Sequence, residues 1–175
     1  MITDRTSADM VDLQARLHSQ CMLCGAEHPQ GLRLAFRTHA DGHVEATFPC
    51  ERLYQGYTGY LHGGVIAALL DSAMTNCLFA HGQATLTGEL NVRFLKPVVI
   101  SRSAIVSARL AESLPPLFHM EADLRQGQEI VARATAKFVE ASWANIRLME
   151  NPSTQGLCRR PTAFDATANI PATTT

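Results

Sequence analysis

The sequence predicts an α+β fold in which one antiparallel sheet of five to six strands wraps around a single long helix. Three observations predict it: residues 64–80 are apolar in nearly every direction around a helix axis, segments of alternating apolar and polar residues lie on both sides, and tight turns separate those segments. A helix that is apolar all round belongs inside a protein, and short connections imply antiparallel pairing. One sheet leaves part of such a helix uncovered, so we also expect self-association.

The elements are expected in the order strand, strand, helix and four strands. Residues 1–20 form a lead segment in which Met10, Leu13 and Leu17 have helical spacing. Segments 32–37 and 44–48 alternate on either side of an Asp41-Gly42 turn, which predicts a hairpin.

The apolar helix comes next, and four strands follow it, near 85–94, 101–110, 118–125 and 130–138. In the first of these, period-2 alternation places Leu86 with Leu90 and Val92 on one face and Thr87 on the other. The domain therefore spans 21–140. Residues 141–175 are rich in Thr, Ala and Pro without periodicity, and we expect a mobile tail there.

The composition fits one globular domain: the chain has 175 residues, 46% of them hydrophobic and 18% charged, with a net charge of −1. So small a charge gives no broad electrostatic reason to expect nucleic acid or an anionic membrane as a partner. The first residues lack the apolar core of a signal peptide, and the five cysteines are too irregular for a disulfide framework. We expect a cytoplasmic protein without a transmembrane span.

Asp71 is the one charge in the apolar helix. An ionised carboxylate in such a place is costly unless it is paired, hydrogen-bonded or shifted in pKa, and groups of this kind cluster at functional sites. The helix begins at His62-Gly63-Gly64, where the free N–H groups of a first turn suit an oxyanion. The alternatives are a structural aspartate that caps a loop and glycines required only by a tight turn.

The sequence resembles the hotdog-fold acyl-CoA thioesterases, and among them the phenylacetate-type (PaaI-like) branch. The similarity covers about residues 21–140 and rests on the segments 55–64, 70–71 and 89–97, together with the lead-in Cys21-Met22-Leu23-Cys24-Gly25. The resemblance implies hydrolysis of an acyl-CoA thioester, no metal, no cofactor besides the CoA of the substrate, and a homodimer or homotetramer.

The resemblance also implies roles for individual residues. Asp71 would be the general base for water or the nucleophile that forms a mixed anhydride, and the Gly63 N–H would be the oxyanion donor. Thr87 matches a Ser/Thr position that helps to hold the water or the acid, although threonine is also an ordinary strand residue. The candidate residues are Asp71, Gly63, Gly64, Thr87 and His62 for catalysis, and Gln55, Ala67, Met74, Arg93 and Lys96 for substrate binding.

His62, Arg93 and Lys96 each have a second interpretation, and one position departs from the family pattern. His62 suits a structural role in the loop before the helix better than the role of a proton carrier. Gly56 stands where the family often has Asn or Gln, with Gln55 beside it. Arg93 and Lys96 suit the phosphates of CoA, or simply a solvated strand end.

Helix geometry separates the two halves of the predicted site. Gly63 and Asp71 are eight residues apart, which is about 12 Å along one helix at ~1.5 Å per residue. They cannot both touch one thioester carbonyl within a single chain, so a site that uses both must combine two subunits.

Other interpretations stay open. Cys21 and Cys24, with His18, His28 and Cys50, permit a zinc site, but without a second closely spaced cysteine pair we favour a turn with two semi-buried thiols. A non-catalytic acyl-CoA or fatty-acyl binding module on the same fold is the main alternative function. A hotdog hydratase or dehydratase is a third, although its usual Asp/His motif is not evident.

Overall fold

The computed structural model describes residues 6–141. The expected C-terminal tail therefore lies outside the described residues, apart from Ala141. The elements are α1 (Thr6–Leu17), β1 (Arg37–Thr38), β2 (Val44–Phe48), a short 3-10 helix η1 (Arg52–Tyr54), α2 (Gly63–Ala80), β3 (Thr85–Phe94), β4 (Ala104–Leu114), β5 (Leu117–Gln126) and β6 (Glu129–Glu140).

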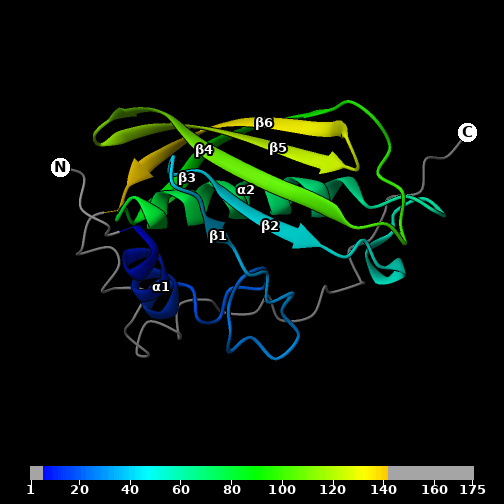
Figure 1. The fold of residues 1–175 in the computed structure, drawn as a ribbon, viewed down its shortest axis with the longest axis horizontal. Coiled ribbons are helices and arrows are strands. Elements are labelled where there is room, and N and C mark those ends of the chain that lie inside the picture. The colour runs from blue at the N-terminus through cyan, green and yellow to red at the C-terminus, as the bar shows by residue number, and fades with distance from the viewer. Residues whose placement is uncertain (1–5, 142–175) are drawn as a thin grey trace, which may run out of the picture. The chain divides into compact units, whose positions relative to one another are not determined.

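The strands form one six-stranded sheet in the order β1-β2-β4-β5-β6-β3, and every neighbouring pair is antiparallel. The long helix α2 runs along one face of this sheet (Figure 1). This is the hotdog arrangement, and it confirms the fold class expected from the sequence.

The core lies between α2 and the inner face of the sheet. Leu69, Leu70 and Met74 of α2 are completely buried. The inner face is built from alternate residues of four strands: Val44, Ala46, Phe48, Ala104, Val106, Ala108, Phe118, Met120, Ala122, Leu124, Ala132, Ala134, Ala136 and Phe138 are all buried. By length and hydropathy α2 is able to cross a membrane, but 67% of it is buried inside the protein, which is the environment of a core helix.

The predicted N-terminal hairpin is only partly correct. Leu34 and Phe36 are buried as the alternation predicts, but β1 contains only Arg37 and Thr38. The segment before it bonds elsewhere, because the Leu32 N–H donates to the Met22 carbonyl at 2.9 Å and the Leu34 N–H donates to the Leu23 carbonyl at 2.9 Å. Those residues therefore pack onto the cysteine-containing lead-in instead of extending the sheet.

A β-bulge in β3 overturns the predicted facing of one strand. The pairing of β3 with β6 shifts register between Thr87 and Glu89, so Thr87 lies opposite Phe138 and Leu90 lies opposite Ala136. Phe138 and Ala136 belong to the inner face, and Thr87 therefore faces α2 together with Leu90. The prediction for Leu86 and Thr87 was wrong because the extra residue, Gly88, interrupts the period of two.

Candidate active site

The start of α2 is fixed by a side-chain cap. His62 has extended backbone angles, with φ −66° and ψ 134°, and its Nδ1 accepts a hydrogen bond from the Gly64 N–H at 2.9 Å. A Cβ on Gly64 would lie 3.0 Å from that Nδ1, so a larger residue there would push the capping ring outward. His62 therefore uses Nδ1 to position the helix, which agrees with the structural role favoured by the sequence.

Gly63 keeps a free backbone donor. Its N–H has no hydrogen-bond partner within residues 6–141, whereas the next donors of the turn are used by His62. The N–H groups of a first helical turn carry positive potential from the helix dipole. A Cβ at Gly63 would meet only the Phe94 ring, at 3.6 Å, so this end of α2 has little around it that blocks an approaching oxygen.

Asp71 and Thr87 form the second half of the predicted site. The Thr87 hydroxyl donates to Oδ1 of Asp71 at 2.8 Å, across the gap between α2 and β3. The second oxygen of Asp71, Oδ2, has no hydrogen-bond partner in the part of the chain that the structure describes. One oxygen is thus held in place while the other is left to act on a water or a substrate.

The surroundings of Asp71 raise its pKa above the ordinary value of 3.8. Burial is the largest cause, because a charge is penalised where water is excluded. The hydrogen bond from Thr87 lowers the pKa, the charge of Cys21 raises it, and the charge of His18 lowers it. A raised pKa makes a carboxylate a stronger proton acceptor, which suits a general base.

The structure separates Gly63 from Asp71 along one continuous helix. Both belong to α2, so the rise of ~1.5 Å per residue keeps the Gly63 N–H about 12 Å from the Asp71 position. The described chain brings Asp71 and Thr87 together, and it places Gly63 apart from them.

The predicted substrate-binding residues occupy different environments. Ala67 is half-buried and lies one helical turn before Asp71. Met74 is completely buried in the core, so in the described chain it contributes to packing and is closed to a ligand. The Gln55 side chain accepts a hydrogen bond from the Gly59 N–H at 3.4 Å, which stabilises the loop before α2.

The two basic candidates differ in their partners. Lys96 forms an ion pair with Glu129 at 2.7 Å. Arg93 is exposed, lies opposite Arg133 in the register of β3 and β6, and has no ion-pair partner among residues 6–141. Arg93 is therefore the better placed of the two to attract an anionic group.

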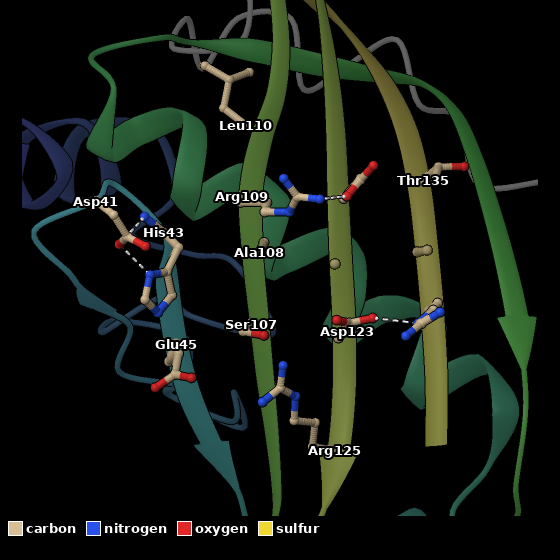
Figure 2. A pocket seen from close by; sticks show the side chains of 14 residues that line it. Asp41, His43, Glu45, Ser107, Ala108, Arg109, Leu110, Asp123, Arg125 and Thr135 are labelled. Carbon is tan, nitrogen blue, oxygen red and sulfur yellow. Dashed lines mark hydrogen bonds and ion pairs between the residues drawn. The ribbon is translucent and has the colours of Figure 1, made fainter. Parts of the chain in front are cut away.

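A broad groove of about 810 Å³ lies on the outer face of the sheet, away from Asp71. Figure 2 shows three pairs among its charged side chains: Asp41 with His43, Arg109 with a glutamate of β5, and Asp123 with an arginine of β6. Neither Asp71, Thr87 nor Gly63 lines it. The groove is a solvated polar surface and has no part in the candidate site.

Three contributors to this site were missed from the sequence. Gly88 turns Thr87 toward α2, and only strand pairing reveals a bulge of this kind. His18 and Cys21 lie near enough to act on the pKa of Asp71. The Cys-x-x-Cys pattern was visible in the sequence, but its place beside α2 depends on how the lead-in folds back.

Comparison with known proteins finds similar sequences and similar folds. Residues 58–133 match the family model of the thioesterase superfamily. The bovine (Bos taurus) acyl-coenzyme A thioesterase THEM4 is 24% identical over 134 residues, which cover 75% of this chain and 55% of that protein. The chain spans about half the length of the curated relatives it matches.

Solved structures share the fold. Protein RHA08564, described as a thioesterase superfamily protein, has a TM-score of 0.63 at 25% identity, covering 66% of this chain and 60% of that chain. The Escherichia coli PaaI protein of the phenylacetic acid degradation operon has a TM-score of 0.59 at 17% identity, covering 62% and 84%. This chain therefore shares the hotdog fold of these structures, and its residues 58–133 match the thioesterase superfamily model.

Proposed function

We propose that this chain hydrolyses an acyl-CoA thioester to the free acid and CoA. The observation that carries the proposal is the Asp71 carboxyl, which has a raised pKa, one oxygen held by Thr87 at 2.8 Å and one oxygen without a partner within residues 6–141. The superfamily match supports the reaction type. The name of the bovine relative, an acyl-coenzyme A thioesterase, supports the substrate class.

The proposed chemistry needs a proton acceptor and an oxyanion donor. As a base, Asp71 takes a proton from a water that attacks the thioester carbonyl; as a nucleophile, it attacks that carbonyl itself and forms a mixed anhydride that water then hydrolyses. In both routes the C–S bond breaks and CoA leaves as the thiolate. The reaction requires no cofactor besides the CoA of the substrate.

The oxyanion donor in this proposal is the Gly63 N–H of a second subunit, because about 12 Å of helix separates Gly63 from Asp71 within one chain. Two features support self-association. The ten-residue strand β3 is an edge of the sheet, paired only with β6, and an open strand edge is a template for pairing with another chain. Leu86, Phe94 and Leu95, on β3 and just after it, are large apolar residues that the single chain leaves exposed.

We assign Arg93 as the contact for the phosphates of CoA. Its guanidinium is exposed and has no carboxylate partner in the described chain, while Lys96 is engaged by Glu129. A planar guanidinium suits bidentate contact with phosphate. Weaker binding of CoA by Arg93→Gln, with no change for an acyl substrate that lacks the nucleotide, is the result this assignment requires.

Replacing Asp71 with Asn tests the activity. The substitution preserves size but removes the base, so turnover should fall by about 10²–10⁴-fold. CoA release is followed with a thiol reagent across short, long and aromatic acyl-CoAs, and circular dichroism verifies the fold. Turnover at the wild-type level in Asp71→Asn would refute the assignment. Tight acyl-CoA binding without any thiol release in the wild type would instead identify a binding module.

Pre-steady-state kinetics separates the two roles of Asp71. A nucleophile accumulates an acyl-enzyme and releases a burst of CoA ahead of the free acid. A general base releases CoA and acid together. Rapid-quench measurement of both products on one substrate distinguishes the routes.

A further inference from the structure

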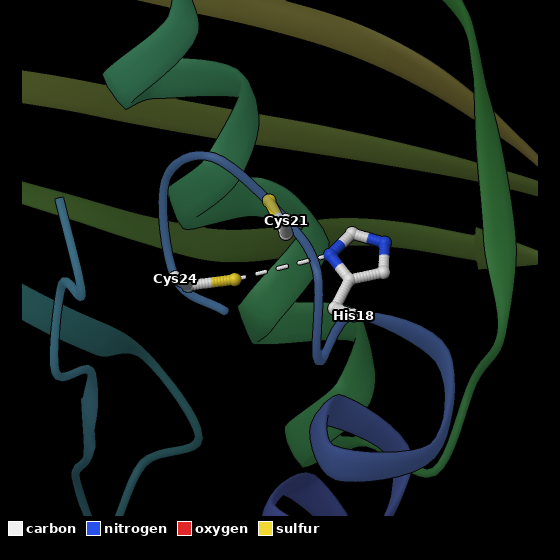
Figure 3. A group of neighbouring side chains, drawn as sticks. All are labelled: His18, Cys21 and Cys24. Atoms are coloured by element: carbon white, nitrogen blue, oxygen red, sulfur yellow. Dashed lines mark hydrogen bonds between the residues drawn. The ribbon is translucent and has the colours of Figure 1, made fainter. Parts of the chain in front are cut away.

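Three side chains with metal-binding atoms meet in the lead-in, outside the proposed catalytic groups. His18 follows the last residue of α1, and Cys21 and Cys24 lie in the loop after it. One ligand atom from each of the three lies within 4.8 Å of the others. Figure 3 shows the three side chains grouped beside α2.

The separation of these atoms suits a tetrahedral ion. With Zn–S near 2.3 Å and Zn–N near 2.0–2.1 Å, tetrahedral geometry places a sulfur and a nitrogen about 3.6 Å apart and two sulfurs about 3.8 Å apart. The Sγ of Cys24 and the Nδ1 of His18 are 3.8 Å apart. The site therefore needs only small side-chain movements to close on an ion.

The loop that carries the cysteines is held in one conformation by its own backbone. The Cys21 N–H donates to the His18 carbonyl at 3.0 Å, and the Gly25 N–H donates to the Cys21 carbonyl at 2.8 Å. A Cβ on Gly25 would lie 2.5 Å from the Ser19 carbonyl oxygen, so this tight turn admits only glycine. The Leu23 N–H donates to Sγ of Cys21 at 3.4 Å, a bond that orients a sulfur ligand.

Contacts outside the loop fix the remaining groups. The His18 ring packs edge-on against Phe79 of α2, with centroids 4.9 Å apart. The Gln14 side chain of α1 donates to the Cys24 carbonyl at 3.1 Å. The three ligands are thus supported from both helices, as a preorganised site requires.

We propose that His18, Cys21 and Cys24 bind one Zn²⁺ ion per chain, and that this ion fastens the end of α1 and the 18–25 loop against α2. Two thiolates and an imidazole are the ligands that zinc prefers among common divalent metals. Water completes the fourth position. The sequence alone favoured a plain thiol turn and no metal, because the spacing of His18 is informative only once α1 and α2 are packed together.

The experiment uses the full reduced chain, stripped of metal by a chelator. Equilibrium dialysis followed by elemental analysis should give one zinc per chain, lost in the Cys21→Ser/Cys24→Ser double variant and weakened at least tenfold in His18→Ala. Titration with Co²⁺ should give a thiolate-to-metal charge-transfer band that disappears in the same double variant.

Two controls isolate this site. Cys50→Ser should keep the Co²⁺ band, because the Cys50 thiol does not belong to the cluster. His39→Ala/His43→Ala should keep it too; that variant removes the second group of ligands, His39, His43 and Glu45, which contains no sulfur.

The wild-type chain provides a test that does not depend on folding of the variants. Chelation should lower its thermal midpoint, and Zn²⁺, but not Mg²⁺, should restore it. The proposal is wrong if the reduced wild type binds no more zinc than the double variant, if Co²⁺ binds without the thiolate band, or if added zinc leaves the midpoint unchanged. Formation of a Cys21–Cys24 disulfide by oxidised glutathione in such a zinc-free protein would identify a redox pair instead.

Discussion

At the scale of single residues, the hydroxyl of Thr87 and the carboxyl of Asp71 act as a unit. The hydroxyl donates to the acid at 2.8 Å and opposes the effect of burial on the acid's pKa. Hydrogen bonds to charged groups contribute about 1.5–3 kcal/mol, so loss of this contact should raise the pKa of Asp71 further.

Replacing Thr87 with Val keeps the shape and removes the donor. Because the Thr87 hydrogen bond lowers the Asp71 pKa, its loss should raise that pKa, and the acid limb of the pH–rate profile should move to higher pH. At neutral pH we expect kcat/KM to fall by about 10–100-fold. Thr87→Ser should restore both, and Thr135→Val on the outer face should change neither. An acid limb that stays in place in Thr87→Val would show that the hydroxyl does not tune the acid.

The buried Asp71 carboxyl should also lower the free energy of unfolding of the chain. Burial raises the pKa of Asp71 in the folded chain above 3.8, so the unfolded chain loses this proton first as pH rises. As pH rises from the Asp71 pKa of the unfolded chain to that of the folded chain, the free energy of unfolding of the wild type therefore falls. It stays lowered at higher pH. Asp71→Asn carries no charge, so its free energy of unfolding should exceed the wild-type value at neutral pH.

Urea denaturation across the acid-to-neutral range, at one protein concentration, measures this difference. The gain in Asp71→Asn should vanish as pH falls below the unfolded pKa. Glu112→Gln, at an exposed carboxyl, should show little gain at any pH. An Asp71→Asn variant less stable than the wild type at neutral pH would contradict the account of the raised pKa.

At the scale of elements, the bulge in β3 positions the hydroxyl. The inward–outward alternation of side chains is reversed across Gly88. Thr87 and Leu90 therefore face the same side of the sheet, although they are three positions apart in the sequence. An ordinary strand would direct Thr87 outward with Glu89 and leave Asp71 without this donor.

Deleting Gly88 should keep Thr87 directed toward Asp71. Thr87 lies opposite Phe138 and Glu89 lies opposite Lys137, so without Gly88 these two become consecutive residues of an unbroken strand and Thr87 still faces α2. We expect kcat/KM to stay close to the wild-type value. Gly88→Ala should also remain active, because a Cβ there would lie 3.4 Å from the Lys137 carbonyl and the bulge is retained. A deletion variant that loses as much activity as Thr87→Val would show that the bulge itself, beyond the register, positions the hydroxyl.

At the scale of the whole molecule, the proposed site requires two chains. Gly63→Pro removes the N–H from the first position of α2, where proline is tolerated because that donor has no helical partner. The pre-proline residue, His62, already has extended angles, which suit it. Gly63→Pro and Asp71→Asn should each be folded and inactive.

Mixing the two inactive variants tests the shared site. In a mixed dimer, one site combines an intact Asp71 with an intact Gly63, and the other site lacks both. Random reassociation of equal amounts should therefore restore about a quarter of the wild-type activity. Analytical ultracentrifugation confirms that dimers exchange. Exchange of subunits without recovery of activity would contradict a site shared between two subunits.

Most of this architecture could be predicted from the sequence, because buried positions of helices and strands are occupied by apolar residues at regular spacing. The apolar run at 64–80 matches α2 (Gly63–Ala80), and the alternation in β2, β4, β5 and β6 matches the buried inner face. Leu34 and Phe36 show the limit of such patterns: alternation reports burial, and it does not say which backbone accepts the hydrogen bonds.

The site was less predictable for a related reason. Asp71 was identifiable as a lone charge in an apolar helix, and Thr87 only through the family resemblance, since its apparent phase placed it on the wrong face. Met74 was a candidate for substrate binding, but packing encloses it completely in the described chain. Contacts between distant segments, such as that of His18 with Phe79, produce no regular spacing in the sequence and could not be predicted from it.

The bulge also bears on how proteins of this fold diversify. Because the bulge absorbs one residue while the pairing on both sides of it is kept, a strand with Gly88 and a strand without it can direct the same threonine toward the same aspartate. Two chains can therefore differ by one residue in strand length and still make this contact. Alignments that close a one-residue gap opposite Gly88 would match the threonine with the wrong residue, and designers of new hydrolases on this scaffold gain a position where a residue can be added without moving the catalytic groups.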